Sequence, residues 1–260
     1  MNTEYLEGLK GWFEDYYNTF DASDDDDRKN YVLKKEHTEE VYKNAVSIAM
    51  AEGFSAEETV LAGICGLLHD VGRFAQYSRY KTFKDSISVN HGLLGSEILL
   101  KYNTLMGLDK NVQDVVLFTV KYHNVFKVPD GLGKVEERFL RLVRDADKLD
   151  IWSVFLKQVE IPQKQRASAA LLGLPESSQY NPEIITIIMD KQVVPLNRVI
   201  TVNDYHLLRL SWIYDLHYKA SFQLLFERQL IAHTLSILPQ DNRILELRDF
   251  LNTYTAVMLK

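Results

Sequence analysis

Cysteine, proline and basic charge are all scarce in this chain of 260 residues. Its one cysteine, Cys65, excludes a disulfide within the chain, and we expect it to be a small buried hydrophobic side chain. The net charge of −6 argues against an extended nucleic-acid surface, which would need a basic face. A local cluster of cations could still hold a small phosphorylated ligand.

Long hydrophobic runs are also missing. No apolar stretch approaches the length that spans a bilayer, and residues 1–10 lack the apolar centre of a signal peptide. We therefore expect a soluble, cytoplasmic protein with no membrane partner. An apolar content of 46% is ordinary for globular proteins, and a chain of this length can bury a large core without disulfides.

Helical periodicity dominates the sequence, while strand-like alternation is sparse. We expect a single all-α domain over residues 1–260, with a motif-bearing core at about 31–160 and a helical extension at about 183–260. The apolar spacing predicts helices at about 4–20, 30–52, 56–72, 91–102, 109–123, 135–159, 205–233 and 241–258. Between them we expect a solvated acidic loop at 21–27, an irregular polar loop at 73–90 and a surface connection at 161–182.

Residues 67–73, with the sequence LLHDVGR, place a histidine beside an aspartate at the end of a predicted helix. Ser55 and Glu58 have the spacing of a capping box that begins this helix, and Gly72 is a plausible stop. His69 lies on the apolar face, and a buried ionised Asp70 is costly unless it is paired or binds a metal. One such pair is weak evidence alone, because chance, capping and ordinary hydrogen bonding also produce it.

Other predicted helices carry a histidine or an aspartate at a similar place, on the apolar face or at its end. Together with the first pair these residues are His37, His69, Asp70, His91, His123 and Asp147. Imidazole and carboxylate groups together suit Mn, Fe, Co, Ni or Zn. Six ligands exceed what one tetrahedral ion needs, so we expect one or two divalent ions, with Asp70 able to bridge a pair.

The ordered set resembles the H…HD…H…H…D pattern of the HD-domain superfamily of metal-dependent phosphohydrolases. The local sequences are similar too: KEHT at 35–38, HDVGRF at 69–74 and DADKLD at 145–150. The resemblance covers about residues 31–160 and implies an all-α bundle with metal at its centre. It further implies a first ion on His37, His69, Asp70 and Asp147, and a second on His91 and His123, bridged by Asp70.

The resemblance implies hydrolysis of a phosphomonoester or phosphodiester, for which a nucleotide is one candidate, by a metal-bound hydroxide at a two-metal site. Arg73 is our first candidate for gripping a phosphate oxygen, because a guanidinium fork fits that geometry. Arg73 stands where related cyclic-dinucleotide phosphodiesterases carry a lysine, but their Gly-Tyr-Pro motif is absent. With Asp70, we expect Arg73 and Lys148 to serve catalysis, although Lys148 could equally be a surface cation.

Three further questions stay open at this point. Asp150 either orients a metal ligand from behind or lies on the surface. The same six ligand types also occur in mixed-valence di-iron oxygenases built on this fold. A metal-bound nucleotide-sensing domain without catalysis is the other alternative.

Overall fold

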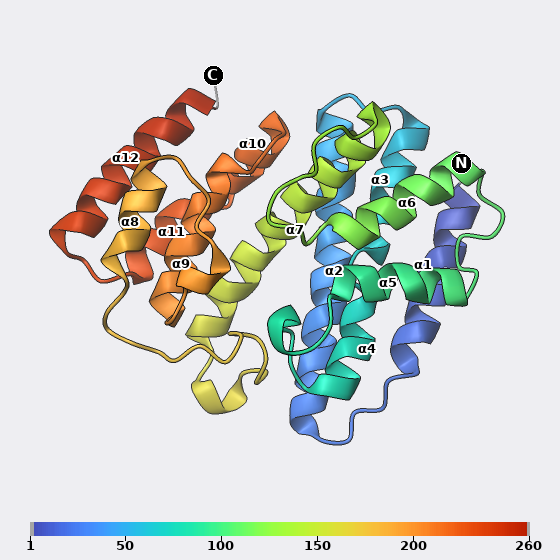
Figure 1. The fold of residues 1–260 in the computed structure, drawn as a ribbon, viewed down its shortest axis with the longest axis horizontal. Coiled ribbons are helices and arrows are strands. Elements are labelled where there is room, and N and C mark those ends of the chain that lie inside the picture. Colours follow the sequence, from blue (N-terminus) through green and yellow to red (C-terminus); the bar gives the residue numbers. More distant parts are fainter. Residues whose placement is uncertain (1–2, 259–260) are drawn as a thin grey trace.

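The computed structural model describes residues 3–258, and every regular element in that range is a helix (Figure 1). The prediction of an all-α fold is therefore confirmed. Among these residues, no helix combines the length and the apolar character needed to cross a membrane. The α-helices are α1 (Thr3–Asn18), α2 (Asp25–Ala51), α3 (Ala56–Leu68), α4 (Val71–Tyr80), α5 (His91–Lys101), α6 (Lys110–Tyr122), α7 (Lys134–Glu160), α8 (Pro182–Met189), α9 (Val202–Ser211), α10 (Lys219–Glu227), α11 (Leu230–Ile237) and α12 (Asn242–Met258).

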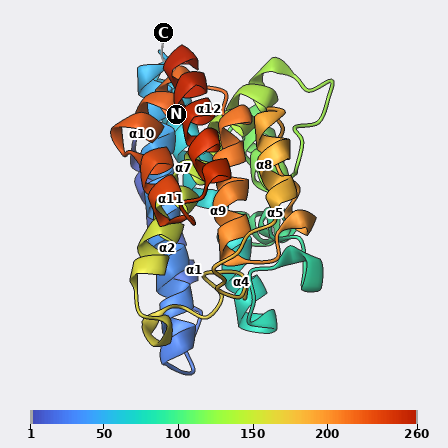
Figure 2. The same ribbon diagram turned by 90° about the vertical axis from the view of Figure 1, so that its left-hand side faces the viewer.

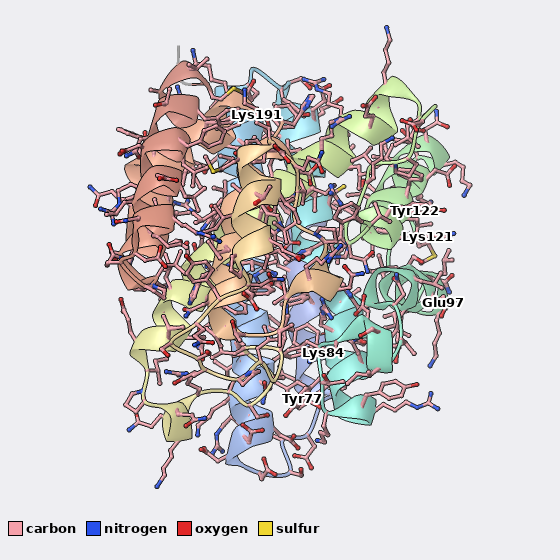
Figure 3. All side chains as sticks on the ribbon, turned by 60° about the vertical axis from the view of Figure 1, so that its left-hand side comes forward. Tyr77, Lys84, Glu97, Lys121, Tyr122 and Lys191 are labelled. Carbon is pink, nitrogen blue, oxygen red and sulfur yellow. The ribbon has the colours of Figure 1, made fainter. Side chains whose placement is uncertain are left out.

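The centre of the fold is formed by α2, α3 and α7, which pack against one another. Val41, Ile64 and Val143, one from each helix, are fully buried at this junction. Side chains fill the spaces between the helices (Figure 3). Burial of apolar surface at this junction is the main force that holds the three helices together.

The long helix α7 is shared by the two halves of the molecule (Figure 1). It packs on α2, α3 and α6 of one half and contacts α10 and α11 of the other. Figure 2 views the molecule from the side of α8–α12. Most of the buried apolar residues of both halves belong to one connected cluster. A single domain over residues 1–260 stays a prediction, and this shared core favours it.

The chain bends at His69 and Asp70, where we predicted a helix continuing to Gly72. Helix α3 ends at Leu68 and α4 begins at Val71, so Gly72 lies inside a helix and does not stop one. A Cβ atom on Gly72 would lie 2.2 Å from the backbone oxygen of His91. This glycine is therefore needed for the close approach of α4 to α5, rather than for a turn.

The prediction of an irregular loop over 73–90 is wrong for its first half, which forms the remainder of α4. Phe74 and Tyr77 are buried there, so the segment is an amphipathic helix. Its many polar residues belong to the exposed face of this helix, and in the sequence we interpreted them as a loop. The acidic run also differs from the solvated loop that we expected. The Asp24 side chain caps α2, and buried Asp27 pairs with Lys81 at 2.6 Å.

The predicted helix over 205–233 is broken into α9, a short 3₁₀ helix η4 (Trp212–Tyr214), α10 and α11. The break before α10 has a tertiary cause: buried Asp145 of α7 accepts hydrogen bonds from the backbone N–H groups of His217 and Tyr218 at 2.9 and 3.0 Å. A left-handed residue, Gln229, separates α10 from α11. The periodicity of the local sequence cannot predict this break, because the carboxylate that stabilises it is distant in the sequence.

The connection over 161–182 is not simply a surface segment. Ala169 and Ala170 are buried, and the backbone N–H of Ala169 donates to the side chain of Asn30 in α2 at 3.2 Å. The side chain of Asp26 accepts a hydrogen bond from the backbone N–H of Ser168 at 3.0 Å. Side chains of α2 thus hold this segment close to the body of the protein.

Candidate metal centre

The structure brings all six predicted ligands to one point. His37 lies in α2, His69 and Asp70 form the corner between α3 and α4, and His91 begins α5. His123 directly follows α6, and Asp147 lies in α7. All of them are buried except Asp147, whose side chain is 17% exposed. Asp147 is therefore the predicted ligand most open to solvent.

Asp70 lies between two pairs of histidines, and each of its carboxylate oxygens faces one pair. Its Oδ2 lies 3.4 Å from Nε2 of His37 and 3.8 Å from Nε2 of His69. Its Oδ1 lies 3.3 Å from Nε2 of His91 and 3.6 Å from Nε2 of His123. Although Asp70 stands directly before α4, its side chain makes no cap hydrogen bond there. The helix end therefore does not occupy either oxygen, although Oδ2 also accepts a hydrogen bond from Nζ of Lys34 at 2.9 Å.

Within each pair the Nε2 atoms converge. They are 3.3 Å apart in His37 and His69, and 3.0 Å apart in His91 and His123. Oδ1 of Asp147 joins the first pair, at 3.2 Å from His37 and 3.8 Å from His69. Three sets of donor atoms lie close enough together to hold an ion: His37–His69–Asp70, His69–His123–Asp147 and Asp70–His91–His123. The donor set of imidazole and carboxylate fits a divalent transition metal.

Every one of the four histidines has an acceptor behind its ring, at Nδ1. Backbone oxygens serve His69 and His123, from Gly66 at 2.7 Å and Val120 at 2.8 Å. The carboxylate of Asp150 lies 2.6 Å from Nδ1 of His37. An acceptor at Nδ1 leaves the lone pair of Nε2 directed at the centre, as metal-ligating histidines require.

The partner of His91 was missed in the sequence. Asp85 lies in the short 3₁₀ helix η1 (Asp85–Ile87), with Oδ2 at 2.7 Å from Nδ1 of His91. No regular spacing connects an acid in an irregular segment with a histidine six residues later, so the sequence held no signal for it. Asp150 is 4% exposed and contacts His37, so its surface alternative is wrong.

The charges around the centre favour ionised carboxylates. Burial alone would raise the pKa of Asp70, but Lys34, at 2.9 Å from Oδ2, and the neighbouring histidines and Arg73 hold that pKa well below its usual range. Burial likewise opposes ionisation of Asp147, and the adjacent His37 and His69 outweigh it, so its pKa is also lowered. Both acids can therefore act as anionic ligands.

The histidines differ in their protonation. Burial lowers the pKa of His69 to about 4 and that of His91 to about 3, so both rings are neutral near pH 7, the form that binds a metal. Burial and Lys34 also act to lower the pKa of His37, but hydrogen bonds to Asp147, Asp150 and Asp70 raise it to about 10. An ion at that position would compete with a proton for His37.

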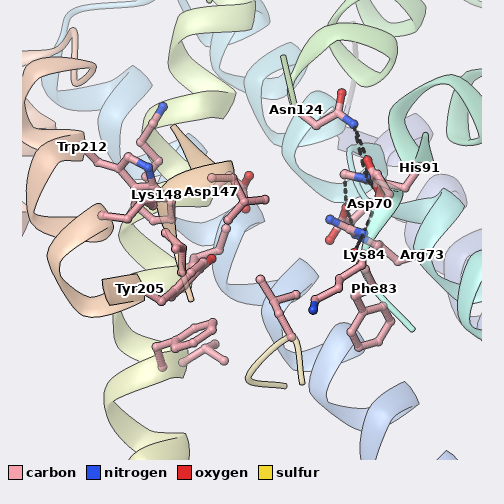
Figure 4. A pocket seen from close by; sticks show the side chains of 18 of the residues that line it. Asp70, Arg73, Phe83, Lys84, His91, Asn124, Asp147, Lys148, Tyr205 and Trp212 are labelled. Carbon is pink, nitrogen blue, oxygen red and sulfur yellow. Dashed lines mark hydrogen bonds and ion pairs between the residues drawn. The ribbon is translucent and has the colours of Figure 1, made fainter. Parts of the chain in front are cut away.

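The centre opens into a cavity of about 750 Å³ (Figure 4). His37, Asp70, His91, His123 and Asp147 all contribute to its wall. Five cations from α2, α4, α7 and the segment after α4 also line it: Lys34, Arg73, Lys84, Arg144 and Lys148. The arrangement can therefore bring a small anionic molecule against the metal ligands.

Arg73 lies beside the centre and is firmly held. Its Nη1 donates to the backbone oxygen of Phe83 at 2.6 Å and to Asp85 at 3.0 Å, while Nε lies 3.4 Å from Oδ1 of Asp70. Among the described residues, none accepts a hydrogen bond from Nη2. That nitrogen remains for a ligand in the cavity that Arg73 lines.

Lys148 is buried in α7, which overturns its surface alternative. Its Nζ lies 2.8 Å from Asp215, an acid that also accepts from Arg144 at 2.6 Å. Asp215 follows η4, outside the part of the chain in which we expected the motifs. Lys148 thus lines the cavity together with Arg144 and Asp215, with which it forms a group of two cations and one acid.

Residues 35–152 match the family model of the HD domain. This segment runs from α2 to α7 and contains all six residues of the ordered set. The chain therefore contains an HD domain over these residues, as the ordered histidines and aspartates predicted. No curated protein and no solved structure matches the chain.

Proposed function

We propose that this protein is a metal-dependent phosphohydrolase with a two-metal His/Asp site. The observation that carries the proposal is the position of Asp70, whose two oxygens face two separate histidine pairs. One ion would be held by His37, His69, Asp70 and Asp147, and the other by Asp70, His91 and His123. Mn, Fe, Co, Ni and Zn all suit such a set of ligands.

Two divalent ions bound here would supply Lewis acidity and would lower the pKa of a water molecule, as in other two-metal hydrolases. The protein's own part is orientation. Asp150 and Asp85 fix the rings of His37 and His91 from behind, so the ligand atoms need no rearrangement. Preorganised groups of this kind stabilise developing charge at little reorganisation cost.

The substrate we propose is a small phosphomonoester or phosphodiester. Five cations and four aspartates line the cavity, so two bound divalent ions would give it a clear positive excess. A positive cavity attracts an anion and raises its local concentration. Arg73 is proposed to bind a nonbridging phosphate oxygen through its guanidinium group, with Lys148 as a further cation on the wall.

The same charges separate the proposal from one of its two alternatives, the oxygenase. A di-iron oxygenase would use the same histidines and aspartates, but it has no evident need of five cations around its substrate. A sensing domain would bind the anion without cleaving it. The cations therefore favour a phosphate substrate, while turnover has to be measured.

The test uses protein loaded with Mn²⁺ or Co²⁺ under anaerobic conditions and a panel of phosphate esters. We expect hydrolysis, and we expect Asp70→Asn to lose both ions and all turnover, because asparagine keeps the size but not the anionic bridge. Asp130→Asn is the matched control, since the Asp130 side chain is 89% exposed and pairs with the exposed Lys127 rather than with a metal ligand. Elemental analysis gives the metal content of each variant.

Two results would contradict the proposal. Turnover that appears only with iron and oxygen would support the oxygenase. Bound metal and bound phosphate ester without cleavage under any metal would support a sensing domain.

A further inference from the structure

The cavity continues beyond the metal centre along one face of α7. Asp147, Ile151 and Val154 all line it, and their spacing of four and three residues puts them on the same side of the helix. At 1.5 Å per residue the lining extends roughly 10 Å past Asp147 along the helix axis. The cavity is therefore much longer than the phosphate site that the metal ligands define.

The far wall of this cavity is almost wholly apolar. Besides residues of α7, it is built from the segments before and within α9, which lie outside the HD domain match. Its apolar members are Ile151, Val154, Phe155, Ala169, Ala170, Leu172, Leu174, Val193, Val194, Leu196, Val199 and Leu208. Only Asn197, Tyr205 and Trp212 add polar side-chain atoms to this part of the described lining.

Three aromatic rings give the wall a firm surface. Phe155 and Tyr205 stack with centroids 4.3 Å apart, and Trp212 lies edge-on to Tyr205 at 6.4 Å. Tyr205 and Trp212 stand on the side of the cavity opposite Arg73 and Lys84 (Figure 4). Behind the rings, the buried guanidinium of Arg209 lies 4.9 Å from the centroid of Phe155. The cation supports the rings from behind, so the wall does not depend on a ligand for its shape.

We infer that the substrate joins its phosphate to a bulky apolar group, aromatic or aliphatic, which packs against this wall. The inference rests on the proposed phosphohydrolase function. A cavity of about 750 Å³ lies in the range of about 300–1,000 Å³ that holds whole organic ligands, and a phosphate group fills only a small part of it. Burial of an apolar group there would add binding energy in proportion to its area.

The same wall disfavours a nucleoside. Ribose hydroxyls and base edges need hydrogen-bond partners, and leaving them unpaired in an apolar site is costly. On this wall, among the described side chains, only Asn197, Tyr205 and Trp212 could pair with them, which is fewer partners than the hydroxyls and base edge of a nucleoside need. The cations near the metal centre would bind the phosphate of any substrate. The class of the group attached to that phosphate is therefore inferred from the apolar wall.

The test measures binding to the unmodified, Mn²⁺-loaded protein by calorimetry, with phosphonates that cannot be hydrolysed. We expect 1-naphthylmethylphosphonate to bind at least about tenfold more tightly than methylphosphonate, a difference of about 1.4 kcal/mol. We expect it to bind more tightly than the 5′-phosphonate analogue of adenosine 5′-monophosphate, which also cannot be hydrolysed, under the same conditions. Equal affinity for 1-naphthylmethylphosphonate and methylphosphonate, or tighter binding of the nucleotide analogue, would overturn the inference.

A pair of variants locates the apolar group. Val154→Phe adds bulk inside the cavity, and Val257→Phe makes the same change on α12, where Val257 is 62% exposed. We expect Val154→Phe to weaken 1-naphthylmethylphosphonate at least about tenfold and to leave methylphosphonate within about twofold. Val257→Phe should change neither. Equal losses for both phosphonates in a Val154→Phe protein that melts like the parent would place the apolar group elsewhere.

Hydrolysis separates this inference from the proposed function. If 1-naphthylmethylphosphonate binds selectively and 1-naphthyl phosphate is not cleaved with any metal, the phosphohydrolase proposal fails and the apolar site stands. If methyl phosphate and 1-naphthylmethyl phosphate, which both release an alkyl alcohol, are cleaved with equal kcat/KM, the proposed function stands and the apolar site fails.

Discussion

Replacing Asp150 should damage one half of the metal centre and spare the other. The Asp150 carboxylate contacts Nδ1 of His37 at 2.6 Å, and the side chain of Asp150 is 6% exposed. In Asp150→Ala the His37 ring loses the group that sets its orientation and the position of its proton. Little solvent reaches this place to substitute for the lost acceptor.

The expected size follows from the type of contact. Carboxylates that hold a ligating histidine from behind contribute about 10- to 100-fold to metal affinity. That corresponds to about 1.4–2.7 kcal/mol for the ion on the His37 side. Asp150→Asn should lose less than Asp150→Ala, because its amide oxygen can still accept a hydrogen bond from Nδ1. Asp150 has no contact with His91 or His123, so the second ion should keep its affinity.

The assay is a titration of metal-free protein with Co²⁺, followed by calorimetry and elemental analysis. Asp85→Ala provides the opposite case, because Asp85 holds His91 at 2.7 Å and should affect the second ion. Asp130→Ala controls for loss of a carboxylate at an exposed position. Parent-like affinity for both ions in Asp150→Ala would refute the reasoning, as would an equal loss at both positions.

Three further predictions concern the surroundings of the centre. The Arg73→Ala variant should keep its metal, because Arg73 is proposed to touch the substrate and no ion. Its turnover of a phosphate ester should fall about 30- to 1,000-fold, or about 2–4 kcal/mol. Kinetics and elemental analysis of the same samples check this, and unchanged turnover would show that Arg73 does not bind the substrate. Burial raises the pKa of Cys65 to about 12 from a usual 9.0, so its thiolate is about a thousandfold scarcer at pH 8 than that of an exposed cysteine. Iodoacetamide should therefore leave the native protein unmodified over hours and should label the protein unfolded in guanidinium. Prompt labelling of the native protein would contradict this prediction. Gly72→Ala should lower the free energy of unfolding by about 1–3 kcal/mol, because the new Cβ would lie 2.2 Å from the backbone oxygen of His91. For the same reason the ion on the His91 side should bind more weakly. A melting curve and a metal titration like those of the parent would show that α4 and α5 can move apart without cost.

The sequence already contained the fold class and the identity of the clustered residues. Helical periodicity is local, so apolar spacing alone predicted an all-helical chain. His37 and Asp147 were recognisable because each is a polar exception on an apolar face, where burial without a partner is costly. The order of such exceptions along the chain also pointed to the HD superfamily, which the family match to residues 35–152 bears out.

Other features could not be read from the sequence, because they depend on segments far apart along it. Asp145 breaks a predicted helix 72 residues later by accepting hydrogen bonds from the backbone N–H groups of His217 and Tyr218. Lys148 pairs with Asp215, although closer acids at 145 and 150 were available in the sequence. In both cases the packing of α7 against the C-terminal helices determines which residue lies close enough to pair.

The tertiary structure alone decided how the centre is supported and what surrounds it. Amphipathic periodicity tells which face of a helix is buried, but not which helix it meets or at what angle. Those crossings put Asp85 behind His91, direct one oxygen of Asp70 at each histidine pair, and set Tyr205 across the cavity from Arg73. The sequence by itself therefore determined which residues gather at the centre, and the packing of the helices determined the geometry between them and the apolar cavity into which they open.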